Sequence, residues 1–142
     1  VHVVRLVLPR MKEKGWGRII NIASVHGLVG SAQKVAYVAA KHGIVGLTKV
    51  VALECAEQNI TCNSICPGWV LTPLVEKQIH ALAEKKNVDF QTASDDLLCE
   101  KQPSKRFTSI DQLGDLAVFL CSESASNLTG ASLPVDGAWI AR

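Results

Sequence analysis

A serine, a tyrosine and a lysine that together could move a proton lie in one stretch of the chain, residues 24–41. Tyr37 and Lys41 are four residues apart, so on a helix they share one face and can reach the same small molecule. A phenol is a poor base at neutral pH, but a neighbouring ammonium stabilises the phenolate. Such a phenol can take a proton from an alcohol or return one to a carbonyl. Ser24 could hold the reacting oxygen by a hydrogen bond, at the position where charge develops.

The Tyr-x-x-x-Lys spacing by itself is weak evidence, because it usually marks an aromatic ring packed under a solvated lysine. Two further features make the combination specific. Ser24 ends the apolar run "RIINIAS" (18–24), which has the β-branched composition of a buried strand. The segment "NSICPGWVLTP" ends the next such run. We therefore interpret Ser24, Tyr37 and Lys41 as candidate catalytic residues.

The elements that must position these residues follow from apolar periodicity and capping signals. Val4, Val7, Leu8 and Met11 have helical spacing, Thr72-Pro73 is a typical helix start, and Ser109 with Gln112 forms a capping-box pattern. The predicted elements are a helix within 1–14, a strand at 18–24, a long helix at 35–58, a strand at 60–68, a helix from 73, a short helix at 94–101, a helix at 110–122 and a strand at 131–137.

This βαβ order predicts an α/β fold with a parallel sheet of about three strands and flanking helices. Such sheets bind ligands beyond the carboxyl ends of their strands. Ser24 and the segment 67–72 both fall at those ends, so the architecture brings the candidate residues together. The long helix carries small residues that would allow close approach of another helix or of the sheet: Ala36, Ala39, Ala40, Gly43 and Gly46.

Composition limits the class of protein. The chain has 142 residues, 48% of them hydrophobic, and a net charge of +2 with scattered basic residues, which predicts one folded domain and no nucleic-acid or membrane partner. The five cysteines show no C-x-x-C pair, and no further ligands have zinc-site spacing, so we expect free thiols, no metal site and a reducing, cytoplasmic location.

At this point the sequence resembles the short-chain dehydrogenase/reductase family. Ser24, Tyr37 and Lys41 are similar to the family's Ser…Tyr-x-x-x-Lys centre, and "CPGWVLTP" and "PVDGAW" resemble its later segments. The resemblance implies the C-terminal part of a Rossmann-like doubly wound sheet and an NAD cofactor. It assigns cofactor contacts to these positions: Tyr37, Lys41 (nicotinamide ribose), Pro67, Gly68, Val70 and Thr72 (the last two near the carboxamide).

A finer resemblance is to the branch of that family that oxidises D-3-hydroxybutyrate, through "ASVHGLVGS", "AYVAAKHGIVGLTK", "PGWVLTPLVEKQI" and "EKQPS". It implies a pocket for a small hydroxy acid, bound by Ser24, by polar contacts from His26, Lys34 and Gln78, and shielded by Trp69 and Trp139. Each of these has an alternative: a loop contact for His26, a solvated Lys34, an exposed Gln78, and core or subunit contacts for the two indoles. His42 and His80 are assigned no role.

Two hypotheses remain open. One is an NAD-dependent 3-hydroxybutyrate dehydrogenase, with another short-chain reductase, such as a 3-oxoacyl reductase, as competitor. The other is a truncated, non-catalytic chain that self-associates, because the family's glycine-rich phosphate turn and its dinucleotide-binding βαβ units do not occur in residues 1–142. The resemblance further implies a homo-oligomer formed through the helices at 1–14 and 35–58 and the last strand.

Overall fold

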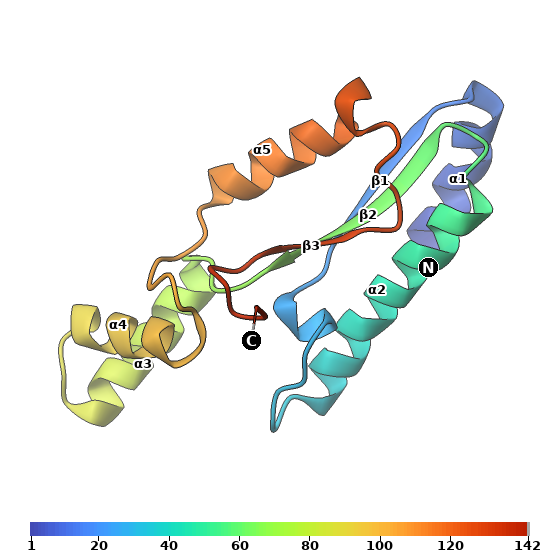
Figure 1. Ribbon diagram of the computed structural model, residues 1–142. Helices are drawn as coiled ribbons and strands as arrows, with labels where there is room; N and C mark the ends of the chain where they lie inside the picture. Colours follow the sequence, from blue (N-terminus) through green and yellow to red (C-terminus); the bar gives the residue numbers. More distant parts are fainter. Residues whose placement is uncertain (142) are drawn as a thin grey trace.

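A three-stranded parallel sheet forms the centre of the computed structural model, which describes residues 1–141 (Figure 1). The strands are β1 (Gly17–Ile22), β2 (Ile60–Pro67) and β3 (Ser132–Val135), in the order β1-β2-β3. Gly17 pairs with Ile60 and Ile22 with Ile65, whereas β3 pairs only with the carboxyl half of β2. The α/β class, the parallel sheet and the strand count are those predicted; Arg142, the end of the predicted domain, lies outside the described residues.

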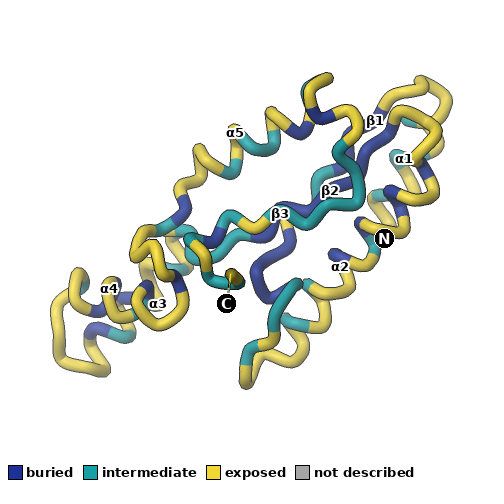
Figure 2. The backbone as a smooth tube through the Cα atoms, viewed as in Figure 1, coloured by how far each residue is buried: buried dark blue, intermediate teal, exposed yellow. Residues whose placement is uncertain are grey.

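The central strand β2 is buried over almost its whole length (Figure 2). A parallel strand covered on both faces has no solvent-exposed side, so the polar residues Thr61, Asn63 and Ser64 are buried together with their apolar neighbours. Its two cysteines are buried and unpaired. Burial raises the pKa of the Cys62 thiol to about 11 and also raises the pKa of Cys66, so both behave as inert apolar groups.

Helices α1 (His2–Lys14) and α2 (Val35–Glu54) cover one face of the sheet (Figure 1). The core on this side is formed by β1, β2 and α2, with Val4, Leu8 and Met11 of α1 packed against it. Gly15 ends α1 in the left-handed conformation, as the sequence predicts. The predicted end of the second helix at Gln58 is wrong: α2 stops at Glu54, and residues 55–59 turn into β2.

The small residues of α2 do not face the sheet. Gly43 and Gly46 have open space around them, and the sheet-facing side is formed by Val45, Thr48 and Val51. Of the two predicted partners, the sheet is therefore excluded, whereas approach of another helix to this uncovered outer face stays a prediction. Among the described helices, α2 alone has the length and apolar composition of a membrane span, which core helices of water-soluble proteins also have.

Helix α5 (Ile110–Cys121) lies over the opposite face of the sheet (Figure 1). Its capping box is formed as predicted: Ser109 Oγ accepts from the Gln112 amide, and the Gln112 side chain accepts from the Ser109 amide. The helix ends at Cys121, one residue before the predicted end. Layers on both faces complete the α/β arrangement.

Helices α3 (Pro73–Lys86) and α4 (Phe90–Lys101) pack on each other beyond the carboxyl ends of the strands (Figure 1). Thr72 caps α3 and Pro73 is its first residue, as predicted. The predicted start of the next helix at Ser94 is wrong, because Asp89 caps a helix that begins at Phe90. The polar residues 91–92 belong to the first turn of α4.

Candidate active site

A cavity of about 460 Å³ opens where the carboxyl ends of β1 and β2 meet helices α2 and α3. It brings together residues from distant parts of the chain. The residues that line it are Ser24, Val25, His26, Lys34, Tyr37, Gly68, Trp69, Val70, Thr72, Leu74, Val75, Gln78 and Trp139. All six residues predicted to contact substrate are among them. Of the other predicted site residues, Lys41 and Pro67 do not line the cavity.

Ser24 lies two residues after the end of β1, in extended conformation, and caps the short 3₁₀ helix η1 (Val25–Gly27). Its hydroxyl oxygen accepts a hydrogen bond from the His26 amide at 3.2 Å. That bond uses a lone pair of the oxygen, so the hydroxyl proton remains for a ligand. Ser24 is buried and lines the cavity, which suits a donor to a reacting oxygen.

Gly27 allows η1 to lie directly against α2. A Cβ at this position would come 2.8 Å from the Lys41 carbonyl oxygen, closer than a side chain tolerates. The close approach places the end of β1 beside the first turns of α2, where Tyr37 and Lys41 lie. A glycine here is therefore a condition for the site's geometry.

Lys41 is held at the end of β1 by a backbone acceptor. Its Nζ donates to the carbonyl oxygen of Ile22 at 3.1 Å and lies 5.6 Å from the centroid of the Tyr37 ring. The ammonium is thus fixed near the phenol, with further N–H donors available to a ligand. Tyr37 is about half exposed (47%) and its ring forms part of the cavity wall.

His26 is the centre of an aromatic cluster on the cavity wall. Its ring makes edge contacts with Tyr37 (5.9 Å between centroids) and with Trp139 (5.4 Å). The side chain is buried, and burial, followed by the charges of Lys34 and Lys101, lowers the pKa of His26 below 6.5. A neutral imidazole at neutral pH can donate one hydrogen bond and accept one.

The two predicted indoles lie side by side. The rings of Trp69 and Trp139 are tilted at 39° with centroids 6.0 Å apart, and Lys34 Nζ lies 5.9 Å from the Trp69 ring centroid. Among the described residues, the buried indole N–H of Trp69 has no hydrogen-bond partner, so it is an available donor. These residues form an apolar wall with one ammonium at its edge.

The segment after β2 forms the rest of the cavity. Gly68, Val70 and Thr72 line it, and Thr72 Oγ1 accepts from the Val75 amide at 3.4 Å, which leaves the Thr72 hydroxyl proton available. Gln78 enters from α3. Three apolar lining residues were not among the predicted site residues: Val25, Leu74 and Val75. Leu74 could have been found, because it lies four residues before Gln78 on the same helical face.

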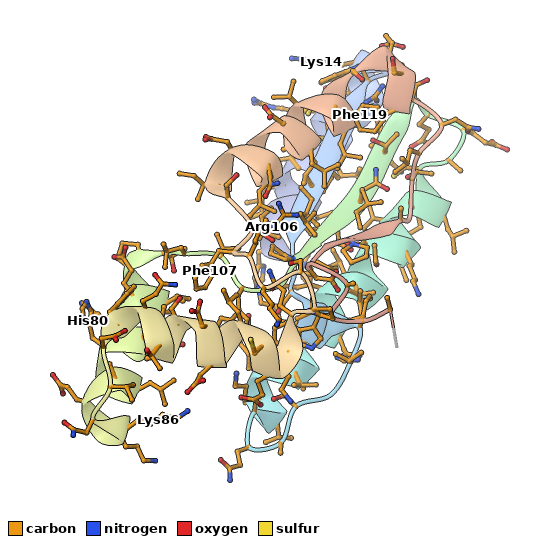
Figure 3. All side chains as sticks on the ribbon, turned by 60° about the vertical axis from the view of Figure 1, so that its left-hand side comes forward. Lys14, His80, Lys86, Arg106, Phe107 and Phe119 are labelled. Carbon is orange, nitrogen blue, oxygen red and sulfur yellow. The ribbon has the colours of Figure 1, made fainter. Side chains whose placement is uncertain are left out.

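His42 and His80 lie outside the cavity lining. The ring of His42 bonds to the carbonyl oxygen of Val38, one turn back on α2, at 3.0 Å. His80 packs on the Phe90 ring, with 4.8 Å between centroids, and Figure 3 shows it on the helix pair α3/α4, away from the sheet. Both contacts are structural.

The residues present fit one end of a dinucleotide. The donors of Lys41 and Thr72 and the buried N–H of Trp69 are of the kind that a nicotinamide ribose and carboxamide require. Residues 1–142 contain no G-x-x-x-G-x-G turn to receive a pyrophosphate. The fit is therefore to the nicotinamide end alone.

The sequence is similar to those of known oxidoreductases. Residues 1–139 match the protein-family model described as enoyl-(acyl carrier protein) reductase. The chain is 60% identical to a D-beta-hydroxybutyrate dehydrogenase of Cupriavidus necator over 99% of this chain and 55% of that protein. It is 52% identical to the enzyme of the same name from Rhizobium meliloti, with the same coverage.

Solved structures of dehydrogenases and reductases also superpose on this chain. L-sorbose reductase from Gluconobacter frateurii, in complex with NADPH and L-sorbose, superposes with a TM-score of 0.91 at 32% identity, over 98% of this chain and 53% of that one. A short chain dehydrogenase family protein from Francisella tularensis superposes with a TM-score of 0.81 at 28% identity, over 88% of this chain and 51% of that one. The chain spans about half the length of the relatives that it matches.

Proposed function

Because this chain belongs to the short-chain dehydrogenase/reductase family, we propose that it carries the substrate-binding and proton-transfer side of an NAD-dependent oxidation of D-3-hydroxybutyrate to acetoacetate. One observation carries the proposal: a single cavity combines Tyr37 and Ser24 with the nitrogen donors of Lys34, His26 and Gln78. The first pair suits a secondary alcohol, and the second set suits a small carboxylate.

Substrate binding uses the polar groups of the cavity wall. The Lys34 ammonium, the neutral imidazole of His26 and the Gln78 amide donate to the carboxylate of the hydroxy acid. The indoles of Trp69 and Trp139 cover the apolar carbons and exclude water, which strengthens those polar contacts. A 3-oxoacyl thioester offers no carboxylate to these donors, so the same residues favour the hydroxy acid over that competitor.

Proton transfer uses the residues at the end of β1 and the start of α2. Ser24 donates a hydrogen bond to the C3 oxygen, and Tyr37 Oη takes the hydroxyl proton. The Lys41 ammonium stabilises the phenolate through the field of a charge fixed 5.6 Å from the ring centroid. A nicotinamide held beside these residues would supply the acceptor for the hydride that leaves C3. The C3–H and O–H bonds break, and the C3 carbonyl of acetoacetate forms.

The test is NADH formation by the purified chain given NAD and D-3-hydroxybutyrate. We expect turnover that Tyr37→Phe lowers by about 100-fold or more, because the proton acceptor is lost. The L enantiomer is the control for the geometry of the cavity. Equal rates for the parent chain and the Phe variant would reject the catalytic proposal.

The second candidate is a non-catalytic chain, and the absence of a glycine-rich phosphate turn in this sequence favours it. Its distinguishing property is substrate binding without turnover. Titration calorimetry with D-3-hydroxybutyrate in the absence of NAD measures binding separately from turnover. Heat of binding, together with no NADH formation in the activity assay, would support the non-catalytic hypothesis and not the catalytic one.

We also propose that the chain forms homo-oligomers through the outer face of α1 and α2. Val3, Leu6 and Leu53 are more than two-thirds exposed there, which is a large apolar area for a free surface. A groove of about 310 Å³ between the helices has Arg5 and Glu54 among its lining residues. In a two-fold arrangement, Arg5 of one copy can face Glu54 of the other.

A further inference from the structure

Gln102, at the end of α4, is the buried polar residue that connects the two tryptophan-bearing segments of the cavity. It is 1% exposed, although its side chain is an amide. A buried amide without partners would destabilise the fold, so its contacts define what it does. None of the cavity-lining atoms belongs to Gln102 itself.

Both ends of the amide are used. Gln102 Oε1 accepts from the Trp69 backbone amide at 2.9 Å, and Nε2 donates to the carbonyl oxygen of Arg106. The backbone of Gln102 bonds in addition to Leu98 and Lys105. Gln102 thus joins the end of α4, the connection to α5 and the segment that follows β2. Figure 3 shows Arg106 and Phe107 in that connection, between α4 and the sheet.

Two glycines leave the space that Gln102 fills. A Cβ at Gly68 would come 2.6 Å from Gln102 Oε1, and a Cβ at Gly137 would come 2.7 Å from Gln102 Cγ. Gly137 also has φ +57°, a conformation that favours glycine. The Gln102 side chain therefore packs against both turns, the one before Trp69 and the one before Trp139.

The backbone around each indole is fixed by neighbouring contacts of the same network. The Trp69 carbonyl accepts from the Thr108 amide at 2.9 Å. The Asp136 carboxylate accepts from the amides of Ala138 and Ile140, on either side of Trp139, at 3.0 Å each. The two turns also contact each other, because Asp136 lies against Gly68. Gln102 packs against both turns and therefore contributes to the relative placement of the two rings.

We propose that Gln102 is a positioning residue, which sets the indole wall of the cavity through the backbone of Trp69 and the turn before Trp139. This proposal rests on the proposed function for its effect on substrate but not for its effect on the indoles. Lys41 is held by the Ile22 carbonyl at the end of β1, and Tyr37 lies beside it on α2, so both are positioned by elements other than those that Gln102 joins. Loss of the amide therefore weakens substrate binding more than proton transfer.

The first experiment needs no substrate. In a Trp16→Phe background, the fluorescence comes from Trp69 and Trp139 alone. Gln102→Met removes both hydrogen bonds at similar volume, and Gln91→Met, on the exposed start of α4, is the matched control. We expect the acrylamide quenching constant to rise at least about twofold in Gln102→Met and to stay unchanged in the control. An unchanged constant in Gln102→Met would overturn the proposal.

Gln102→Glu keeps an acceptor for the Trp69 amide but places a carboxylate oxygen against the Arg106 carbonyl. We expect it to raise quenching less than the Met variant does. If Gln102→Met does not fold, the Gln102→Glu variant tests the proposal instead. An acrylamide quenching constant equal to that of the parent would then reject the positioning role.

The second readout is the split between KM and kcat for D-3-hydroxybutyrate. We expect Gln102→Met to raise KM about 10-fold, with kcat changed by less than about threefold. Parallel loss of both, with a lower Tm and unchanged quenching, would make Gln102 a purely structural residue and overturn the proposal. If the parent chain itself shows no turnover, the proposed function fails while the quenching result still decides the role of Gln102.

Discussion

At the scale of single residues, the proposed mechanism separates the groups that bind from the groups that react. In it, Lys34 and His26 meet the carboxylate, whereas Ser24 and Tyr37 meet the alcohol oxygen, and all four line one cavity. Lys41 is fixed beside the phenol by the Ile22 carbonyl. A substitution in the first set should therefore change affinity, and one in the second set should change rate.

Lys34→Met tests the carboxylate contact. We expect KM for D-3-hydroxybutyrate to rise about 10- to 100-fold with little change in kcat, because a charge-assisted hydrogen bond is lost. Steady-state kinetics measure this, with Lys49→Met on the exposed side of α2 as the control. An equal loss for a secondary alcohol that has no carboxylate would contradict the assignment.

The lowered pKa of His26 predicts that the stability of the fold depends on pH. Because burial lowers that pKa in the fold, the unfolded chain binds the proton first as the pH falls below 6.5. The stabilisation from the neutral imidazole is complete above about pH 6.5 and is lost between that pH and the lowered folded pKa. We expect Tm to fall more steeply from pH 7 to pH 5 for the parent than for His26→Gln. Parallel curves would contradict the prediction.

At the scale of elements, the helix pair α3/α4 is the least supported part of the cavity wall. It has its own small apolar cluster, in which Ile79 and Ala93 are fully buried, and Figure 2 shows most of its surface exposed. Its outer end lies away from the sheet, as His80 and Lys86 show in Figure 3. Gln78 and Leu74 depend on this pair for their place in the cavity.

Ile79→Ala should loosen this pair. Removing a fully buried isoleucine costs about 2–5 kcal/mol through lost transfer energy and the cavity left behind. We expect amide hydrogen exchange in α3 and α4 to rise more than in β2 or α2. Ile110→Ala, at a position that is 68% exposed, is the control and should change little. Uniform loss of protection across the chain would show that the pair does not open separately.

At the scale of the whole molecule, the sheet has helices on both faces, but the outer sides of α1 and α2 remain apolar and uncovered (Figure 2). Contiguous exposed apolar area is typical of a protein–protein interface. The proposed homo-oligomer covers these outer sides with a second copy of the chain. The opposite charges of Arg5 and Glu54 would favour one relative orientation of the two copies.

Leu53→Lys tests the oligomer. Leu53 is 79% exposed, so a lysine there does not disturb the core but places a charge in the proposed interface. We expect light scattering to show a smaller assembly for this variant than for the parent. Val118→Lys, on α5 and 72% exposed, is the control and should assemble like the parent. Equal masses for the parent and Leu53→Lys would reject this face as the interface.

The local signals of the sequence determined most of the elements. Caps and periodicity act within a few residues, so the start of α3, the capping box of α5 and the end of α1 followed from Thr72, Ser109 and Gly15. Local signals failed where polar residues begin a helix, as at the start of α4, and where a turn replaces its last residues, as at the end of α2.

The sequence also determined which residues could form a site, because Ser24 and Tyr37 lie at predicted ends of elements that a parallel sheet brings together. Only the tertiary structure decided how they are held. The carbonyl of Ile22 that fixes Lys41, the contact of His26 with Trp139, and the burial of Gln102 between Gly68 and Gly137 join residues far apart in the chain. No pattern within a short window encodes such contacts, since they depend on which faces of separate elements meet when the sheet and helices pack.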